Sequence, residues 1–503
     1  METTTSNPRL RSLLVIAAFV VFTALLVYRL GDRELWLDEV ITIGHTQTAH
    51  PAYDAFHPDG YYRLMYQWRQ LFGSSDGALR ALSVPFALLA LLLVWLLASR
   101  LLPAPTAILA LWLVALSPFA LLYLRMARYF SLTLAATLLV VYLALLARER
   151  AQPVYYLLLG LATVALLNVD YVACLGVPLL YLWLRGTTEE RRPARWWWLP
   201  AAALPAAFLL LKLPALLHDA RGVAGVAAAP PTLHGLLLKL GLPFYSATVG
   251  ETTDFWRFYL VVPVGLAGML LWGLGLRNLW RRGGPNRWLL LAPWPLLVVI
   301  ATVVLSTLAA GEPWPRVSSF SLYALPFFLM TVAAGTLRLR RWAAVVLVGI
   351  FLLGQLYGVS NYLARRQFLN PGYNVAWREV SRLIGSRTSP GEVAITFWDA
   401  SISRYWDAPA RLVDITVPGG EQQEPSLRDF PSSGGGVWLI DRDRGSDTAR
   451  TATEAFVTRM RALAATTEEF SVMPLSPTEQ RWRSRLGGRP ADPAYLRVYH
   501  FRP

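Results

Sequence analysis

Long apolar runs are the feature that most constrains this chain. Eleven of them fall in the first 360 residues, most about as long as the 17 to 25 residues that cross the hydrocarbon core of a bilayer. Their apolar residues form unbroken blocks, with neither a two-residue nor a 3.6-residue period. The sequence therefore predicts a mostly α, polytopic helical membrane protein. The runs lie at residues 13–30, 78–98, 106–123, 130–147, 154–168, 171–184, 196–217, 258–276, 288–309, 318–336 and 342–360.

Composition agrees with a membrane protein. Of the 503 residues, 55% are hydrophobic and 16% are charged, whereas roughly 25% of a soluble domain is charged. A net charge of +15 would suggest nucleic-acid binding in a soluble protein. In a polytopic membrane protein the same positive charge reflects basic cytoplasmic loops, so no nucleic-acid partner is expected. The lone Cys174 excludes an intramolecular disulfide.

The distribution of arginines predicts the orientation. Short loops on one side of the predicted spans hold sixteen of them, while the basic residues of the opposite loops are matched by acids. The positive-inside rule then places the N-terminus in the cytoplasm and everything after residue 361 outside the cytoplasmic (inner) membrane. A cleaved signal peptide is the alternative for the N-terminus, but the first apolar run ends in LVYRLGDRE, without a small-residue cleavage site.

Two domains are predicted. Residues 1–361 form the transmembrane domain, with outward loops at 31–77 and 218–257, and residues 362–503 form an outer soluble domain. In the latter, helical spacing at Trp377–Arg387 and Thr451–Thr466 alternates with strand-like runs. These runs are GEVAITFW, RLVDITV, GGVWLID and AYLRVYHF. The alternation predicts a small α/β domain.

The first outward loop carries the candidate catalytic groups. LWLDEV places Asp38 and Glu39 side by side just after the first span. A partly desolvated carboxylate at a membrane surface is suited to accept a proton from an attacking hydroxyl; a solvated loop acid is the alternative. His57, Tyr61 and Tyr62 follow, as candidates to line a sugar or lipid-phosphate pocket or as interfacial aromatics.

Basic residues on the outer side are candidate phosphate ligands. Arg125 and Arg128 lie in a very short outward loop, against the positive-inside trend, and guanidinium binds phosphate bidentately. Lys239, in an apolar segment that reads as an interfacial helix, and Arg316, before the tenth span, are further candidates. The HExxH, CxxC and GxGxxG motifs are absent. No cofactor or metal site is predicted, and a divalent metal stays an open alternative.

Taken in order, these motifs resemble those of the GT-C class of membrane glycosyltransferases. The branch concerned contains the protein O-mannosyltransferases and the lipid A aminoarabinose transferase. The resemblance rests on LWLDEV, HPDGYY, DGALRALSVPFALL, RMARYFS and the ALPFF that follows Arg316, and it extends over roughly residues 10–400. One departure is Asp59, which replaces the second proline of the family's HPP element.

This resemblance implies an inverting transferase that takes one sugar from a polyprenyl-monophosphate donor. Asp38 is then expected to be the general base, with Glu39 and His57 orienting the reacting groups. Arg128, with Lys239 or Arg316, is expected to stabilise the departing lipid phosphate. The expected partners are the donor, membrane lipids and a lipid, glycan or protein acceptor. A glycan polymerase with a lipid-diphosphate donor, a lipid or glycan transporter, and a non-catalytic scaffold are the alternatives.

Overall fold

The computed structural model confirms a mostly helical protein with a small α/β domain at its C-terminal end. It describes residues 8–48, 58–188, 196–224, 233–308, 317–397, 399–415, 427, 430, 435–442, 447–487 and 491–503. By its contacts the chain divides into two units. The first, called here the membrane unit, comprises Met1–Asp32 and Thr42–Leu369; the second, called the α/β unit, comprises Arg33–Ile41 and Asn370–Pro503.

Each of the eleven predicted apolar runs contains an apolar helix. Seven helices of the described residues are long and apolar enough to cross a membrane, and α6 (Ala104–Ala115) with α7 (Pro118–Leu124) forms a further, bent candidate. The remaining three runs hold shorter apolar helices: Pro153–Leu167, Ala173–Gly186 and Trp288–Ile300. The protein is therefore a multi-pass membrane protein. The fifth and sixth runs form separate helices.

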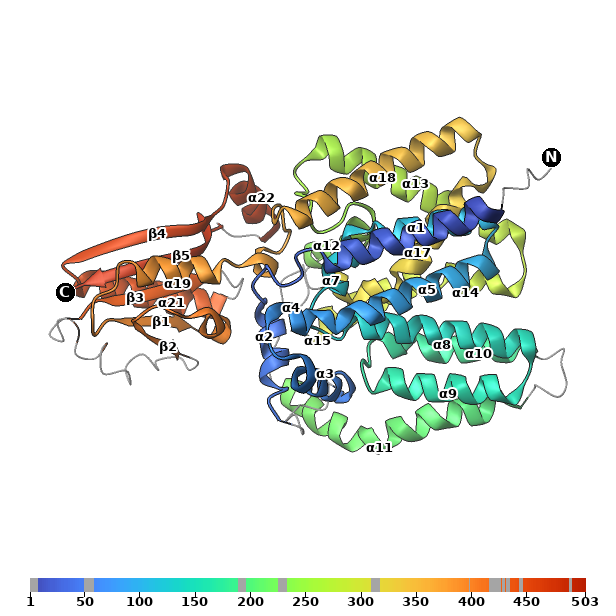
Figure 1. Cartoon of the computed structure of the whole chain (residues 1–503), viewed down its shortest axis with the longest axis horizontal. Coiled ribbons are helices and arrows are strands. Elements are labelled where there is room, and N and C mark those ends of the chain that lie inside the picture. The colour runs from blue at the N-terminus through green and yellow to red at the C-terminus, as the bar shows by residue number, and fades with distance from the viewer. Residues whose placement is uncertain are drawn as a thin grey trace. The chain divides into compact units, whose positions relative to one another are not determined.

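The helices of the membrane unit include several that lie nearly parallel, among them α1, α5, α8 and α9 (Figure 1). The helical elements up to residue 188 are α1 (Pro8–Val27), α2 (Leu37–Gly44, which crosses the boundary between the units), α3 (Gly60–Phe72), α4 (Asp76–Ala81), α5 (Ser83–Leu101), α6 (Ala104–Ala115), α7 (Pro118–Leu124), α8 (Phe130–Arg150), α9 (Pro153–Leu167), η1 (Ala173–Gly176) and α10 (Val177–Thr188). Those that follow are α11 (Trp198–Ala224), α12 (Leu233–Thr248), α13 (Phe258–Arg282), η3 (Pro285–Arg287), α14 (Trp288–Leu291), α15 (Pro293–Leu308), α16 (Val317–Ser321), η5 (Leu322–Ala324), α17 (Leu325–Ala334), η6 (Gly335–Arg338) and α18 (Arg341–Leu363).

A bend of 54° separates α6 from α7. Pro118 opens α7, and its ring disfavours helical geometry at the preceding Ser117, which is extended and accepts a hydrogen bond from the amide of Ala120. After this break α7 runs for only seven residues and ends at Leu124. The turn that follows, residues 125–129, therefore carries both predicted arginines.

Helix α13 packs closely against α17 and η6 because glycines remove the side chain at the contact. A Cβ at Gly275 would lie 1.9 Å from the carbonyl oxygen of Thr331. A Cβ at Gly335 would lie 2.1 Å from the carbonyl oxygen of Leu271. Small residues at helix contacts allow this approach in membrane proteins.

The α/β unit contains a five-stranded mixed sheet in the order β2-β1-β3-β5-β4. β1 pairs in parallel with β2 and β3, whereas β5 runs antiparallel to β3 and β4. Its elements are η7 (Pro371–Asn374), α19 (Trp377–Gly385), β1 (Val393–Phe397), η8 (Ala400–Tyr405), β2 (Arg411–Ile415), β3 (Val437–Arg442), α21 (Asp447–Leu463), β4 (Thr466–Pro474), α22 (Pro477–Gly487) and β5 (Ala494–Arg502).

Both faces of the sheet are covered. On one face Trp377 and Val380 of α19 pack with Trp438 of β3, and on the other Phe456 of α21 packs with Ile395 of β1. Burial on both sides explains why β1 is an uninterrupted apolar run. The four predicted strands are present, but β4 was not predicted. The predicted helix Thr451–Thr466 was wrong at its ends: it begins at Asp447 and stops at Leu463, because Thr466 already belongs to β4.

Candidate functional site

The acidic pair lies in the first turn of α2. Glu39 is fully buried, and its Oε2 accepts a hydrogen bond from the amide of Trp36 at 3.2 Å. Trp36 precedes the helix, so this contact is the reciprocal half of a capping box, in which the third helical residue satisfies the N-cap amide. Asp38, one residue earlier, is only partly buried. The geometry thus gives Glu39 a structural role and leaves Asp38 as the accessible carboxylate.

The two predicted arginines are buried in the turn between α7 and α8, with exposed fractions of 4% for Arg125 and 7% for Arg128. Arg125 donates to the carbonyl oxygen of Tyr28 and lies 5.1 Å from the ring centre of Tyr362. These contacts attach Arg125 to the residue that follows α1 and to α18.

Arg128 has a different environment. It donates to the hydroxyl of Thr42 at 2.8 Å and lies over the rings of Tyr129, at 4.9 Å, and Phe130, at 5.9 Å. Because Phe130 begins α8, the guanidinium lies at a helix N-terminus. The dipole of such a terminus favours an anion, as the guanidinium does.

The predicted tyrosines lie near Arg128. Tyr61 and Tyr62 of α3 are buried, with ring centres 5.8 Å apart, and the Tyr61 ring lies 6.4 Å from that of Tyr129. Tyr129 therefore contacts both Tyr61 and Arg128. Of the other candidates, Lys239 is buried on α12, whereas His57 and Arg316 lie outside the described residues.

A buried acid for which no role was predicted, Asp170, lies between α9 and η1. The carboxylate of Asp170 accepts hydrogen bonds from the Tyr323 hydroxyl at 2.6 Å and from the Val172 amide at 2.7 Å. The same loop receives the start of α3, because the Gly60 amide donates to the Asn168 carbonyl oxygen at 2.9 Å. An acid between two apolar runs is costly in a membrane protein, and that signal could have identified Asp170.

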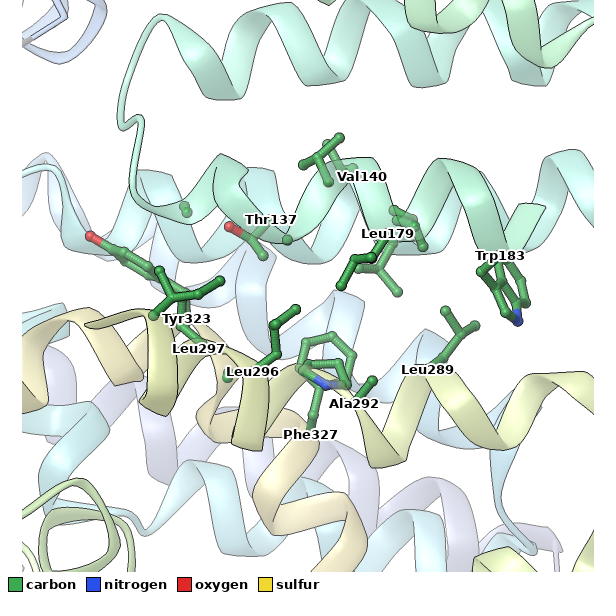
Figure 2. A pocket seen from close by; sticks show the side chains of 18 of the residues that line it. Thr137, Val140, Leu179, Trp183, Leu289, Ala292, Leu296, Leu297, Tyr323 and Phe327 are labelled. Atoms are coloured by element: carbon green, nitrogen blue, oxygen red, sulfur yellow. The ribbon is translucent and has the colours of Figure 1, made fainter. Parts of the chain in front are cut away.

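An apolar cavity of about 320 Å³ lies beside Tyr323 in the membrane unit. Its walls come from α8, α10, α15 and α17, with Thr137, Leu179, Leu296 and Phe327 among the lining side chains. Figure 2 shows Tyr323 at one end of this row of side chains and Trp183 at the other. The volume is at the lower end of the roughly 300–1,000 Å³ of small-molecule pockets, and the lining suits a hydrocarbon chain.

A second missed acid, Glu251, lies in the predicted outward loop 218–257, where the sequence analysis assigned it no role. It is fully buried and accepts hydrogen bonds from the hydroxyls of Tyr123 and Ser246, each at 3.0 Å. Glu251 thereby connects α7 with α12. Among the described residues, no three His, Cys, Asp or Glu side chains come together in a way that would hold a metal ion.

Comparison with known proteins gives matches to one family model and to several solved structures. A family model described as dolichyl-phosphate-mannose-protein mannosyltransferase matches residues 58–217, roughly a third of the chain. This stretch includes Tyr61, Tyr62, Arg125 and Arg128. Among curated proteins, no sequence matches the chain significantly.

Solved structures resemble the chain over nearly its whole length. ArnT from Cupriavidus metallidurans in the apo state matches with a TM-score of 0.54 at 12% identity, over 97% of each chain. The same protein bound to undecaprenyl phosphate matches with a TM-score of 0.50 at 13% identity, also over 97% of each chain. The apo oligosaccharyltransferase of Archaeoglobus fulgidus matches with a TM-score of 0.54 at 11% identity, over 99% of this chain and 89% of the other. At these identities the likeness establishes the fold.

Proposed function

The chain has the fold of the GT-C glycosyltransferases, and from this premise we propose that it transfers one sugar, with inversion, from a polyprenyl-monophosphate donor to an acceptor hydroxyl. Fold alone does not determine function, so the proposal also depends on the chemistry of the membrane unit. The single observation that carries it is that α8 has a buried arginine at its N-terminus and an apolar cavity along its length.

The geometry of α8 matches a phosphate joined to a hydrocarbon chain. Arg128 lies just before the helix, and Thr137, nine residues later, lines the cavity. At about 1.5 Å per residue this places the cavity wall roughly 13 Å along the helix from the arginine. A charged head at Arg128 and an isoprenoid tail in the cavity fit this separation. The structure of ArnT from Cupriavidus metallidurans bound to undecaprenyl phosphate supports this proposal.

In the proposed reaction the acceptor hydroxyl attacks the anomeric carbon of the donor sugar. A bond forms between the acceptor oxygen and that carbon, while the bond from the carbon to the phosphate oxygen breaks. Asp38 takes the proton of the hydroxyl as general base, and the lipid monophosphate leaves with the bonding electrons. Arg128, with Lys239 or Arg316, stabilises the negative charge of the phosphate. Attack opposite to the leaving phosphate inverts the configuration.

The proposal includes the location of the reaction. The arginine-rich loops predicted to be cytoplasmic support an N-terminus in the cytoplasm. The turn with Arg128 and the α/β unit then lie on the outer face of the cytoplasmic membrane.

A transfer assay tests the function. Purified protein in lipid nanodiscs is given a panel of labelled polyprenyl-phosphate sugars with candidate acceptors, beside the Asp38→Asn variant. We expect one donor to be consumed by the wild-type protein, and a rate lower by roughly 10² to 10⁴ in the variant, since general base catalysis contributes about that factor. Near-wild-type turnover by Asp38→Asn would remove the proposed base. Consumption of lipid-diphosphate donors alone, with a growing product, would favour the polymerase.

A further inference from the structure

The segment that carries Asp38 belongs by its contacts to the α/β unit. Arg33–Ile41 groups with Asn370–Pro503, more than 300 residues later in the chain. The most direct connection is a hydrogen bond from the Leu35 amide to the hydroxyl of Tyr405, at 2.6 Å, across a separation of 370 residues. Leu35 is fully buried, so its amide depends on a protein acceptor.

Two further contacts hold the same segment. The ring of Trp36 meets that of Tyr373 edge to face, with centres 4.8 Å apart and planes at 90°. Arg378 of α19 lies 3.6 Å from the Glu34 carboxylate and 4.8 Å from the ring centre of Tyr405. The residues just before Asp38 are therefore fixed by a hydrogen bond, an aromatic contact and an ion pair.

A largely buried arginine at the end of β3 interacts electrostatically with Asp38. Arg442 forms an ion pair of 2.7 Å with the fully buried Asp399 and lies 3.4 Å from the hydroxyl of Tyr495. Burial lowers the pKa of Arg442, but Tyr495 and the charges of Asp399 and Asp38 raise it, and the net pKa lies above the usual value. The charge of Asp38 is thus among those that act on the Arg442 guanidinium.

We propose that the α/β unit positions Asp38 for its reaction, with Tyr405, Arg378 and Arg442 as positioning residues. This inference rests on the proposed function, which makes Asp38 the general base. A base must be held close to its reacting geometry, because a displacement of about 1 Å can lower a rate roughly 10²-fold. Residues on strands and helices of a packed domain supply that support better than a mobile loop.

The first arm of the test needs no activity. Hydrogen exchange of peptide 33–41 is followed by mass spectrometry in the full-length protein in nanodiscs, for wild type, Tyr405→Phe and the matched control Tyr499→Phe. Tyr499 is a buried residue of β5 on the opposite face of the sheet. We expect Tyr405→Phe to exchange at least tenfold faster in this peptide, and Tyr499→Phe to match wild type. Equal exchange in all three proteins would overturn the proposal that the α/β unit holds the segment.

The second arm is kinetic. Tyr405→Phe and Arg442→Gln are expected to lower kcat by about 10- to 100-fold while the KM for the donor stays within about twofold, because positioning of the base affects the chemical step. Arg442→Lys, which keeps the charge, should restore part of kcat. Arg497→Gln is the matched control, since it breaks a 2.6 Å ion pair with Asp441 in the same sheet.

The outcomes separate the two proposals. Faster exchange with unchanged kcat, or a raised KM at unchanged kcat, would overturn the positioning role and leave the proposed function intact. A wild-type protein that turns over no donor would overturn the proposed function and, with it, the role given to Asp38. The exchange arm would still decide whether the α/β unit holds the segment.

Discussion

The guanidinium of Arg128 and the hydroxyl of Thr42 lie 2.8 Å apart, although 86 residues separate them. Thr42 is in the second turn of α2, and Arg128 precedes α8. Their hydrogen bond therefore joins the first predicted outer loop to the turn where we propose that the lipid phosphate binds. Through this bond Thr42 orients the guanidinium.

Replacing Arg128 by glutamine should weaken the binding of undecaprenyl phosphate about 10- to 100-fold. A hydrogen bond to a charged group contributes about 1.5 to 3 kcal/mol, and each 1.4 kcal/mol is about a factor of ten. Binding of the radiolabelled lipid to protein in nanodiscs measures the effect. Arg100→Gln is the control, because Arg100 pairs with Glu149 at the opposite end of the neighbouring helices α5 and α8. Equal affinities in the two variants would remove Arg128 from the phosphate site.

Filling the cavity should weaken the use of donors with long lipid chains more than the use of donors with short ones. Leu296→Trp introduces a larger side chain into the cavity wall, so the KM for long polyprenyl donors should rise at least tenfold. For a donor with one or two isoprene units, the KM of the variant should equal that of the wild-type protein. The same change at Leu157, which is 53% exposed on α9, is the control. If Leu296→Trp affects long and short donors equally, the cavity does not hold the tail.

Glu39→Gln should keep most of the transfer activity, because an amide oxygen can still accept the bond from the Trp36 amide. Glu39→Ala removes that acceptor and leaves a buried N–H unsatisfied, at a cost of about 1 to 3 kcal/mol, so its rate and its unfolding temperature should both fall. Transfer rates and thermal unfolding of the two variants check this. A loss in Glu39→Gln as deep as that expected for Asp38→Asn would show that Glu39 reacts.

Most of the fold could be predicted from the sequence because the membrane imposes a strong pattern. A helix that crosses lipid must be apolar over a fixed length, and all eleven predicted ranges contain apolar helices. Strand β4 was missed for the opposite reason. Its sequence is TTEEFSVMP, and among the described strands it pairs with β5 alone, at an edge of the sheet. It therefore lacks the buried apolar run that identified β1.

The candidate site was predictable in its residue types but not in its contacts. Arg128 was identified because two arginines in a short outer loop oppose the charge rule. Asp170 and Glu251 were passed over, since their partners Tyr323 and Tyr123 come from helices distant in the sequence. The contact between Leu35 and Tyr405 depends on tertiary structure in the same way, and no local pattern contains it.

Acid should destabilise the α/β unit through a buried pair on its sheet. His500 stacks on Trp438, with ring centres 3.7 Å apart, and burial lowers the pKa of His500. Burial raises the pKa of Glu392, but hydrogen bonds from Trp438 and Thr388 outweigh it and the net pKa is lowered. In both cases the unfolded chain binds more protons than the folded one, so stability falls as the pH drops.

For His500 the loss begins near its unfolded pKa of about 6.5, and for Glu392 it follows at lower pH. Thermal unfolding of the full-length protein between pH 8 and pH 5 should show this decline, and His500→Gln should flatten it between about pH 7 and pH 5. A wild-type unfolding temperature independent of pH would contradict the proposal that protonation of His500 and Glu392 destabilises the α/β unit.

Gly275→Ala should destabilise the contact between α13 and α17. Its added methyl group would lie 1.9 Å from the Thr331 carbonyl oxygen, so the helices must separate. Overpacking of this kind typically costs about 1 to 3 kcal/mol. Gly273→Ala is a control on the same helix, since a Cβ there meets no atom within 4 Å. Unfolding temperatures in detergent should fall for Gly275→Ala and not for Gly273→Ala.

The grouping of Arg33–Ile41 with the α/β unit has a consequence for biosynthesis. The ribosome makes Leu35 and the segment with Asp38 first, and Tyr405, whose hydroxyl binds the Leu35 amide, follows 370 residues after Leu35. At roughly 5 to 20 residues per second, about 20 to 75 seconds pass before this contact can form. A chain that stops short of the α/β unit can insert its apolar helices but leaves the Asp38 segment without these partners. If the α/β unit positions Asp38 as proposed, a nascent enzyme becomes fully active only after the α/β unit has been made.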